Sequence, residues 1–450
     1  MPPSFLVEDV ATYIADVVSG KYVKALQHVS AVPPNQTVVR VNTLLATVSQ
    51  VKSQLLASLA KGSVVTEAEC IGDVLLIPGS GKRDVKAVPS QGAIVVDSKC
   101  GEAVCRGANV FAPGIVAMSP DVRQGDFVGV FVDVKSSCIR GQKVHESDLL
   151  GLHVVFLGNG RAEMSRRDIF IQTSAPRGLA VKMTDPLYLH ASLNGVLPRL
   201  IFLQNLPSVV AGHVLDPKPG SCILDMCAAP GGKATHIATL MKDLGTVIAI
   251  DKTSNKITRV LNLAERLGIK CIKAFQADSR FLVQKDAKDS PDFAPPFRPE
   301  SFDKIILDAP CSCLGQRPRF DCGPSLRELR SFPVLQKSLL KSAVQLLKPG
   351  GELVYCTCTI SPEENESQVA SFLREFATMK LVKQLPHIGG RGMEGYGLSE
   401  KECDMVQRFD VARDDLKRDA SSSHDTIGFF IAKFRKARET KKGFRKTTSS

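Results

Sequence analysis

The stretch SCILDMCAAPGGKATHIATLMKDLGTVIAID, residues 221–251, decides the fold of this chain. Residues 222–226 are apolar except for Asp225 and predict a buried strand, and residues 235–241 predict an apolar helix. A second apolar run follows and ends on Asp251. A strand, a glycine turn, a helix and a second strand that ends on an acid form the unit with which Rossmann-like sheets bind nucleoside cofactors.

The turn of this unit favours S-adenosylmethionine over a cofactor that is bound through phosphates. It lacks the G-x-G-x-x-G pattern of dinucleotide sites, and Cys227 and Ala234 occupy positions at which a Walker loop carries glycine and serine or threonine. Gly231 and Gly232 let the backbone approach a ligand, and Asp251 can accept hydrogen bonds from ribose hydroxyls. The alternative is an ordinary parallel-sheet turn whose glycines only permit close packing.

The composition points to a globular protein with a polyanionic partner. At 450 residues the chain is long enough for two or three domains, and its net charge of +12 suits such a partner or, alternatively, a solvated basic surface. No apolar run reaches membrane-spanning length and the N-terminus does not resemble a signal peptide, so we expect no membrane partner. The 13 cysteines at irregular spacings indicate reduced thiols of the cytosol or nucleus, and we expect a cytoplasmic protein.

Changes in composition divide the chain into four parts. Residues 1–90 predict an N-terminal α/β segment that contains a strand at 38–41. From about residue 91 to 170, short β-branched runs separated by glycines predict a small all-β barrel, within a domain that we expect to span residues 91–185. Because this barrel is locally basic, it favours an accessory domain that binds nucleic acid, with a plain packing domain as the alternative. Residues 186–436 form the cofactor-binding domain, and residues 437–450 a basic disordered tail.

Beyond the glycine turn, strands and helices alternate as in an α/β protein with a parallel sheet. The pattern predicts helices at 255–267, 335–347 and 365–372, and strands at 271–275, 305–307, 353–357 and 426–434. Three strands of this domain lead to an acid: Asp251, Asp278 and Asp308. Because ligands bind at the carboxyl ends of parallel strands, we expect Asp278 to hold the adenine and Asp308 to face the reacting substrate. Each acid could instead cap a helix.

Two strand ends also carry cysteine, Cys311 after Asp308 and Cys358 in the run CTCT at 356–359. A thiol at a carboxyl edge beside a helix N-terminus can have a lowered pKa and act as a nucleophile, although buried structural thiols are common. Cys356 and Cys358 share one strand face, so periodicity does not choose between them. Cys311, Cys313, Cys356 and Cys358 could together hold zinc, but structural zinc sites use wider spacings, and we expect no metal.

Three motifs in this order, CAAPGGK at 227–233, DAPC at 308–311 and TCT at 357–359, resemble the Sun-family (NSUN) RNA cytosine-5 methyltransferases. Residues 100–114 resemble a PUA domain, so the resemblance covers most of the chain and is closest to the PUA-containing member of the family, a tRNA methyltransferase. It implies a class I, Rossmann-like core that uses S-adenosyl-L-methionine, with an inserted PUA β-barrel. The implied substrate is a cytosine in the tRNA acceptor stem near the 3′ CCA end, with messenger RNA open as a second substrate, and we expect a monomer.

The resemblance also implies roles for individual residues. Cys358 would attack carbon 6 of the cytosine, and Cys311 would assist release of the product. Asp308 would hydrogen-bond the ring nitrogen and the amino group of the base, with Lys233 on the floor of the site. The residues implied to contact the cofactor or edge its pocket are Cys227, Ala228, Ala229, Pro230, Gly231, Gly232, Lys233, Asp251, Asp278 and Asp308.

The PUA-like segment carries the expected RNA contacts. Arg106 and Arg140 are expected to bind phosphates, and backbone groups near Phe111 could read unpaired terminal bases. Two residues depart from the family pattern without replacing a proposed catalytic residue: Cys313 stands where glycine is usual and Cys356 where serine is common. The alternatives to a tRNA methyltransferase are the same chemistry on ribosomal RNA, or an RNA-binding protein whose methyltransferase core is inactive.

Overall fold

The predicted strand–turn–helix–strand unit forms the centre of a parallel sheet. The computed structural model describes residues 6–88, 92–171, 176–286, 293–410, 412 and 425–438. In it the unit consists of β12 (Cys222–Asp225), α8 (Gly232–Leu240) and β13 (Thr246–Asp251). The sheet runs in the order β14 (Ile272–Gln276), β13, β12, β15 (Phe302–Asp308), β16 (Leu347–Thr357), β19 (Phe429–Lys436) and β17 (Met379–Leu381), with β18 (Gln407–Phe409) paired to β19. The strands from β14 to β16 are parallel, so their carboxyl ends share one edge.

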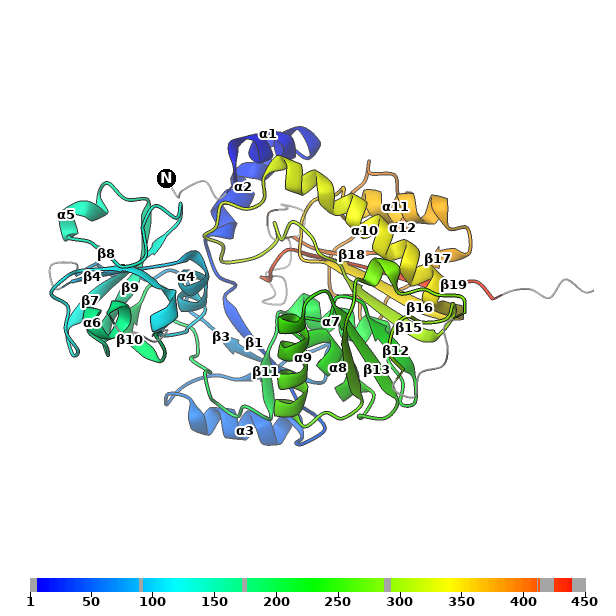
Figure 1. The fold of residues 1–450 in the computed structure, drawn as a ribbon, viewed down its shortest axis with the longest axis horizontal. Coiled ribbons are helices and arrows are strands. Elements are labelled where there is room, and N and C mark those ends of the chain that lie inside the picture. Colours follow the sequence, from blue (N-terminus) through cyan, green and yellow to red (C-terminus); the bar gives the residue numbers. More distant parts are fainter. Residues whose placement is uncertain are drawn as a thin grey trace, which may run out of the picture.

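Helices cover both faces of this sheet (Figure 1). One face packs against α7 (Leu206–Leu215), α8 and α9 (Ser254–Leu267), and the other against α10 (Leu326–Leu346) and α11 (Glu366–Glu375). The side chains of β13 alternate between the two cores, Val247 and Ala249 in the first, Ile248 and Ile250 in the second. A strand that is buried on both faces needs apolar residues at every position, and β13 has them.

The predicted elements of this domain are found, but several boundaries differ: the strand predicted at 353–357 begins at Leu347, and the one predicted at 305–307 spans Phe302–Asp308. The helix predicted at 335–347 begins earlier, at Leu326, because Ser325 and Glu328 form a capping box there and the helix continues through Pro333. The last strand begins at Phe429 rather than at 426. The tail predicted at 437–450 lies almost entirely outside the described residues. Within the described part of the chain, no helix is both long and apolar enough to span a membrane.

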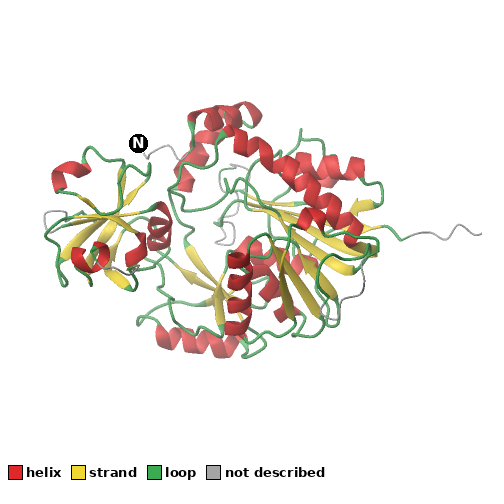
Figure 2. Cartoon of the chain, in the orientation of Figure 1, coloured by secondary structure: helices red, strands yellow, loops and turns green. Residues whose placement is uncertain are grey.

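A second, smaller body is built around one mixed sheet (Figure 2). Its strand order is β5 (Val110–Phe111), β10 (Leu179–Pro186), β9 (Val154–Ala162), β7 (Phe127–Asp133), β4 (Ala93–Val96), β6 (Ile115–Met118) and β8 (Gln142–Lys143). The prediction of an all-β barrel missed its short helices α4 (Ser98–Cys105), α5 (Glu146–Leu149) and α6 (Arg166–Phe170). The first of these forms because the Asp97 side chain caps it and accepts a hydrogen bond from Cys100 N (2.8 Å).

The N-terminal elements lie between the two bodies (Figure 1). They are α1 (Glu8–Val17), α2 (Gly20–Ser30), β1 (Gln36–Val41), α3 (Val48–Ser58), β2 (Thr66–Glu67) and β3 (Val74–Pro78). Their sheet is completed by β11 (Ile201–Leu203), which follows the second body in sequence and pairs with β1. The sheet therefore crosses the domain boundary predicted at 185/186, because strand pairing joins segments that are distant in sequence.

Buried charged residues of the N-terminal segment form hydrogen bonds and ion pairs with α7 and with the first turns of α8. Arg40, only 2% exposed, donates from Nη2 to Thr235 Oγ1 (3.0 Å) and also bonds the carbonyl of Gly232. The Asp73 carboxylate meets the Nε2 atoms of two histidines, His213 at 2.7 Å and His236 at 2.8 Å. Since Thr235 and Gly232 lie in the first turn of α8, the N-terminal sheet holds the helix that follows the glycine turn.

Candidate active site

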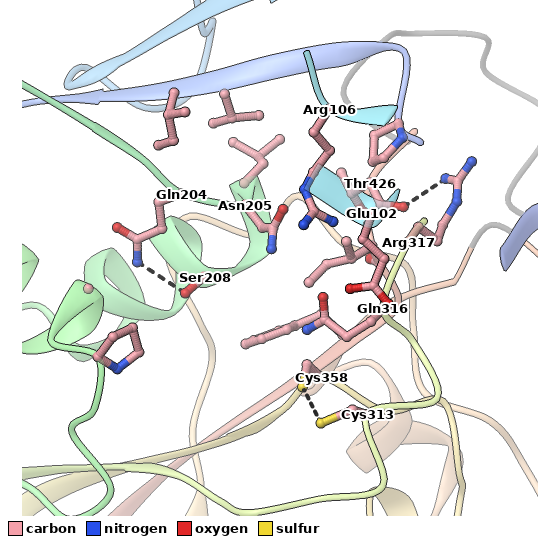
Figure 3. A pocket seen from close by; sticks show the side chains of 18 of the residues that line it. Glu102, Arg106, Gln204, Asn205, Ser208, Cys313, Gln316, Arg317, Cys358 and Thr426 are labelled. Carbon is pink, nitrogen blue, oxygen red and sulfur yellow. Dashed lines mark hydrogen bonds between the residues drawn. The ribbon is translucent and has the colours of Figure 1, made fainter. Parts of the chain in front are cut away.

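A cavity of about 610 Å³ opens at the carboxyl edge of the parallel sheet. The turn after β12 and the loops after β15 and β16 line it together with residues of the N-terminal sheet and of the PUA-like domain (Figure 3). Of the predicted catalytic residues, Cys358, Asp308 and Lys233 line the cavity, and Cys311 lies directly beside Cys358. The fold thus brings together four residues whose positions in the sequence span more than 100 residues.

Three thiols meet at this edge. The Sγ atoms of Cys311 and Cys358 are 3.4 Å apart, those of Cys313 and Cys358 3.5 Å, and those of Cys311 and Cys313 4.0 Å. Cys356 is fully buried within β16, and its Sγ lies 3.5 Å from Asp308 Oδ1. The structure therefore makes the choice that periodicity could not, since Cys358 reaches the cavity and Cys356 does not. Of the four thiols considered for zinc, those of Cys311, Cys313 and Cys358 come together, whereas that of Cys356 lies apart from them.

Hydrogen bonds link the three clustered thiols and shift their pKa values in different directions. Hydrogen bonds from Cys311 and Cys358 lower the pKa of Cys313. The hydrogen bond that Cys311 makes to Cys313 raises the pKa of Cys311. A hydrogen bond from Cys311 favours the Cys358 thiolate, but the bond to Cys313 and burial outweigh it, so the pKa of Cys358 is raised. Within the cluster the thiolate form is thus favoured on Cys313, and a Cys358 thiolate would form if Cys358 gave its proton to Cys313, whose sulfur lies 3.5 Å away.

An ion pair forms the floor of the cavity. Lys233 Nζ lies 2.7 Å from Asp308 Oδ2 and 5.3 Å from the centre of the Phe429 ring. Burial alone would lower the pKa of Lys233, but the Asp308 carboxylate outweighs it and raises the pKa above its ordinary value. The lysine therefore stays charged and holds one carboxylate oxygen of Asp308 in a fixed position.

Asp225, at the carboxyl end of β12, is a site residue that the sequence prediction did not include. It lines the cavity, is fully buried, and its Oδ2 atom has no hydrogen-bond partner. Burial, followed by the nearby Asp308 charge, raises the pKa of Asp225 to about 7. A buried carboxyl oxygen without a partner fits a ligand that brings its own hydrogen-bond donor. The feature of the sequence that could have identified Asp225 as a site residue is that it is the one acid in an otherwise apolar strand.

The residues predicted for the cofactor differ in their placement. Those that line the cavity are Cys227, Ala228, Ala229, Pro230, Gly232, Lys233 and Asp308. Asp251 stands at the end of β13, where its Oδ2 accepts a hydrogen bond from Ala229 N (3.1 Å) and its Oδ1 one from Lys252 N (2.7 Å). The Asp251 carboxylate therefore supports the glycine turn directly.

Gly231, Asp251 and Asp278 are not among the residues that line this cavity. Gly231 has a φ of 105°, and a Cβ there would lie 3.2 Å from Val260 Cα of α9, so close packing of the helix accounts for this glycine. Asp278 caps the short helix η3 (Ser279–Phe281) by accepting from Arg280 N (3.1 Å), and it also binds the Arg280 guanidinium. Within the chain, Asp278 therefore acts as a helix cap, which was the alternative to a cofactor contact.

A buried carboxylate, Glu364, joins the two cysteine loops and was not predicted. Its Oε2 accepts hydrogen bonds from Ser312 N (3.1 Å) and Gln336 Nε2 (2.8 Å), and its Oε1 bonds the Ser312 hydroxyl. That hydroxyl also lies 2.6 Å from Thr359 Oγ1. Because Ser312 separates Cys311 from Cys313 and Thr359 follows Cys358, this network fixes the relative positions of the thiols. A glutamate in a loop carries no periodic signal by which sequence could identify it.

Replacing Glu364 with glutamine should change how stability depends on pH. Burial raises the pKa of Glu364 from 4.5 to about 7, although hydrogen bonds from Ser312 and Gln336 oppose this shift. The folded protein therefore binds a proton more strongly than the unfolded chain does, and the wild type loses stability relative to Glu364→Gln as the pH rises from 4.5 to about 7. Urea unfolding of both proteins across this range measures the difference, and a constant difference would contradict it.

The loop after Cys311 reaches the core of the PUA-like domain. Phe320, only 2% exposed, packs among the buried residues of that domain, and its backbone N donates to Glu102 Oε1 (3.3 Å). Gly101 of α4 lies beside this ring, but its lack of a side chain makes room for Val132, since a Cβ there would lie 2.5 Å from Val132 Cγ2. One loop thus connects the clustered thiols with the PUA-like domain.

The three predicted RNA-binding residues lie in two places. Arg106 lines the cavity, and its side chain lies near Asn205 (Figure 3). Arg140 is exposed elsewhere on the domain and donates from Nη1 to the carbonyls of Pro113 (2.9 Å) and Ile115 (3.0 Å), which follow the 45% exposed Phe111. Arg140 therefore supports the backbone whose exposed groups were expected to read RNA, whereas Arg106 faces the cavity.

The chain matches known proteins along most of its length. The model of 16S rRNA methyltransferase RsmB/F matches residues 212–435, and that of the PUA domain residues 92–185. The chain is 47% identical to the mouse tRNA (cytosine(72)-C(5))-methyltransferase NSUN6, with 91% of this chain and 89% of the relative covered. It is 32% identical to the Arabidopsis thaliana rRNA (cytosine-C(5))-methyltransferase NOP2C, with 89% and 86% covered. The crystal structure of NSun6 from Pyrococcus horikoshii with SFG aligns with a TM-score of 0.76 at 30% identity and covers 97% of this chain and 100% of that one.

These matches confirm the predicted class I methyltransferase core, its PUA domain and S-adenosylmethionine as the cofactor. The rRNA-type relative is more distant than the tRNA-type one, and the order of the two domains agrees with the order found in the structure. The chain therefore belongs to the NSUN6 family of PUA-containing tRNA (cytosine-C5)-methyltransferases.

Proposed function

We propose that this protein methylates carbon 5 of a cytosine in the acceptor stem of tRNA, near the 3′ CCA end, as a monomer in the cytoplasm. The supporting observation is that the sulfurs of Cys358 and Cys311, 3.4 Å apart, meet the Lys233–Asp308 ion pair at a cavity that Arg106 of the PUA domain also lines. The proposal includes messenger RNA with an unpaired cytosine as a second substrate.

The geometry suits the chemistry of this reaction. Carbon 5 of cytosine is a poor nucleophile until the Cys358 thiolate adds to carbon 6, which turns the ring into an enamine whose carbon 5 takes the methyl group. Asp308, held by Lys233, hydrogen-bonds the ring nitrogen and amino group and stabilises the adduct. After a base removes the proton from carbon 5, the bond between carbon 6 and sulfur breaks and its electron pair returns to Cys358. Cys311 assists this release from its position beside Cys358.

S-adenosylmethionine supplies the methyl group when it is bound. The turn at 227–233 would hold it, and the free Oδ2 atom of Asp225 fits the amino group of such a ligand. Oδ2 of Asp251, which accepts a hydrogen bond from Ala229 N, keeps an unused lone pair and would accept from a ribose hydroxyl, whereas Oδ1 already meets Lys252 N and Lys256 Nζ (3.0 Å). Asp278 would lie near the adenine. The residue set therefore fits a cofactor that presents hydrogen-bond donors and no phosphates.

The PUA domain would select the RNA, because a pocket for one base cannot choose among many cytosines. It would bind the 3′ end of the tRNA and present the nearby cytosine to the cavity. The target base must leave its stack, which costs a few kcal/mol and least where it is already unpaired. In this proposal, residues 91–185 bind RNA and residues 186–436 carry out methyl transfer. Residues 1–90 contact both domains and keep them in position.

Bisulfite sequencing of total RNA from cells with and without the protein tests the proposal. We expect 5-methylcytosine to disappear from the tRNA acceptor stem when the protein is absent. Loss confined to ribosomal RNA would replace the proposed substrate. No loss in any RNA class, together with no methyl transfer by the purified protein, would indicate an inactive core that only binds RNA.

Replacing Asp251 with alanine should weaken cofactor binding. The change removes the acceptors for the ribose hydroxyls and the support of Ala229 N, and hydrogen bonds to a charged group are each worth about 1.5–3 kcal/mol. The affinity for S-adenosylmethionine should therefore fall roughly tenfold or more, measured by calorimetric titration. Unchanged affinity would rule out Asp251 as a cofactor residue.

Replacing both Arg106 and Arg140 with alanine should weaken tRNA binding and flatten its salt dependence, with cofactor affinity intact. Loss of one phosphate contact lowers the salt slope by about one. Since Arg140 holds the backbone after Phe111, trimming the 3′ nucleotides from tRNA should cost the wild type more activity than the double variant. Equal losses in the two proteins would mean that these arginines do not help to bind the RNA end.

A further inference from the structure

The third thiol of the active site, Cys313, is not needed by the proposed methyl transfer. That reaction uses two cysteines, Cys358 and Cys311, yet the Cys313 sulfur lies 3.5 Å from the first and 4.0 Å from the second. Cys313 takes a φ of 55°, in the left-handed region that favours glycine, so a cysteine is held there against its backbone preference. The result is a triangle of sulfurs with one side open to the cavity, because Cys313 and Cys358 both line it.

The dimensions of this triangle are those of a thiolate metal site. Zinc binds cysteine sulfur at about 2.3 Å with tetrahedral angles, which places neighbouring sulfurs about 3.8 Å apart. The three separations observed between Cys311, Cys313 and Cys358 are 3.4, 3.5 and 4.0 Å, so small side-chain shifts would bring all three into coordination. The fourth position of the tetrahedron would face the cavity.

The backbone around the triangle is fixed by partners outside it. The carbonyl of Cys313 accepts a hydrogen bond from Arg319 Nη1 (2.9 Å), and the carbonyl of Cys358 accepts one from Gly315 N (3.1 Å). Outer contacts of this kind orient the ligands of metal sites before the ion arrives.

We propose that Cys311, Cys313 and Cys358 bind a thiophilic divalent ion such as Zn²⁺, and that the bound ion reversibly silences the enzyme. Each thiol gives its proton to solvent on binding. Silencing rests on the proposed function, because it follows from the loss of the Cys358 thiolate as a nucleophile. The ion occupies the place of the target base and not that of the cofactor, so it competes with RNA and leaves S-adenosylmethionine binding intact.

A second cluster of metal-ligand side chains, Asp73 with His213 and His236, is a weaker candidate. Both carboxylate oxygens of Asp73 already pair with an imidazole Nε2, at 2.7 and 2.8 Å, and His236 is fully buried. None of the three lines the cavity. This cluster is explained by its role in joining the N-terminal sheet to α7 and α8.

Zinc binding to the full-length protein, without RNA or cofactor, tests the site directly. Competition with a chromophoric chelator should give one tight site, and Co²⁺ in its place should show the charge-transfer absorption of thiolate ligands. Cys313→Gly should weaken binding by more than the roughly 100-fold that loss of an outer-shell partner costs. Cys322→Ser, an exposed thiol on the same loop, and His213→Ala should bind as the wild type does. Equal affinity in Cys313→Gly, or loss of the site in His213→Ala, would overturn the proposal.

Methyl transfer then tests the silencing. One equivalent of Zn²⁺ should inhibit the wild type, a chelator should restore its activity, and more tRNA should relieve the inhibition whereas more S-adenosylmethionine should not. Cys313→Gly, compared with its own metal-free rate, should resist the same zinc concentration. Tight binding without inhibition would overturn the silencing. Because the binding experiment uses no RNA, a protein inactive on tRNA would still report on the site.

Discussion

Replacing Cys358 with alanine should abolish methyl transfer and the covalent complex with RNA. The change removes the thiolate that adds to carbon 6, and loss of a nucleophile typically lowers the rate by a factor of roughly 10⁴ or more. Cys356 cannot substitute, because it is fully buried and its sulfur faces Asp308. The rate is measured by transfer of a labelled methyl group to tRNA, and Cys70→Ser, an exposed thiol outside the site, is the control.

Replacing Cys311 should instead trap the reaction. Without the thiol beside Cys358, the methylated base cannot leave, so Cys311→Ala should not turn over but should accumulate an RNA-linked protein that survives denaturing gel electrophoresis. If Cys358→Ala gives the trapped species and Cys311→Ala does not, the two roles are reversed.

Replacing Phe320 with alanine should uncouple the PUA domain from the catalytic loop. Truncating a buried phenylalanine costs about 3–5 kcal/mol, and here the cost falls on the contact between the loop after Cys311 and the PUA core. Because a displacement of about 1 Å in a reacting group can lower a rate 10²-fold, we expect kcat/KM for tRNA to fall roughly 10- to 100-fold. Calorimetry should show unchanged affinity for S-adenosylmethionine, since Phe320 lies outside the cofactor turn.

A matched exposed residue separates this effect from general damage. Leu385, 80% exposed, should tolerate alanine with no change in either measurement. An unchanged kcat/KM in Phe320→Ala would mean that the PUA domain does not position RNA through this loop, and lost cofactor affinity would mean that the catalytic domain itself had been disturbed.

The sequence predicted correctly those features that depend on residues close together along the chain. The strand, glycine turn, helix and second strand of residues 221–251 form from neighbours along the chain, and their hydrophobic spacing gave each element within a few residues. The three short motifs named Asp308, Cys358 and Cys311, of which the first two line one cavity and the third lies beside Cys358, and the family and cofactor they implied are confirmed. Even α10 was missed only at its start, where a capping box outweighed Pro333.

Tertiary structure decided what depends on residues far apart in sequence. Periodicity placed Cys356 and Cys358 on one strand face, and only the end of β16 at Thr357 sends Cys358 into the cavity. Ser312 meets Glu364, and Phe320 meets Glu102, across separations of 52 and 218 residues. No spacing rule encodes such contacts, because they arise when strand order brings separate loops to one edge of the sheet. The sequence alone thus determined the fold class and proposed the reacting groups, whereas the folded chain determined which thiol reaches the cavity, what holds it there and how the loop after Cys311 contacts the PUA domain.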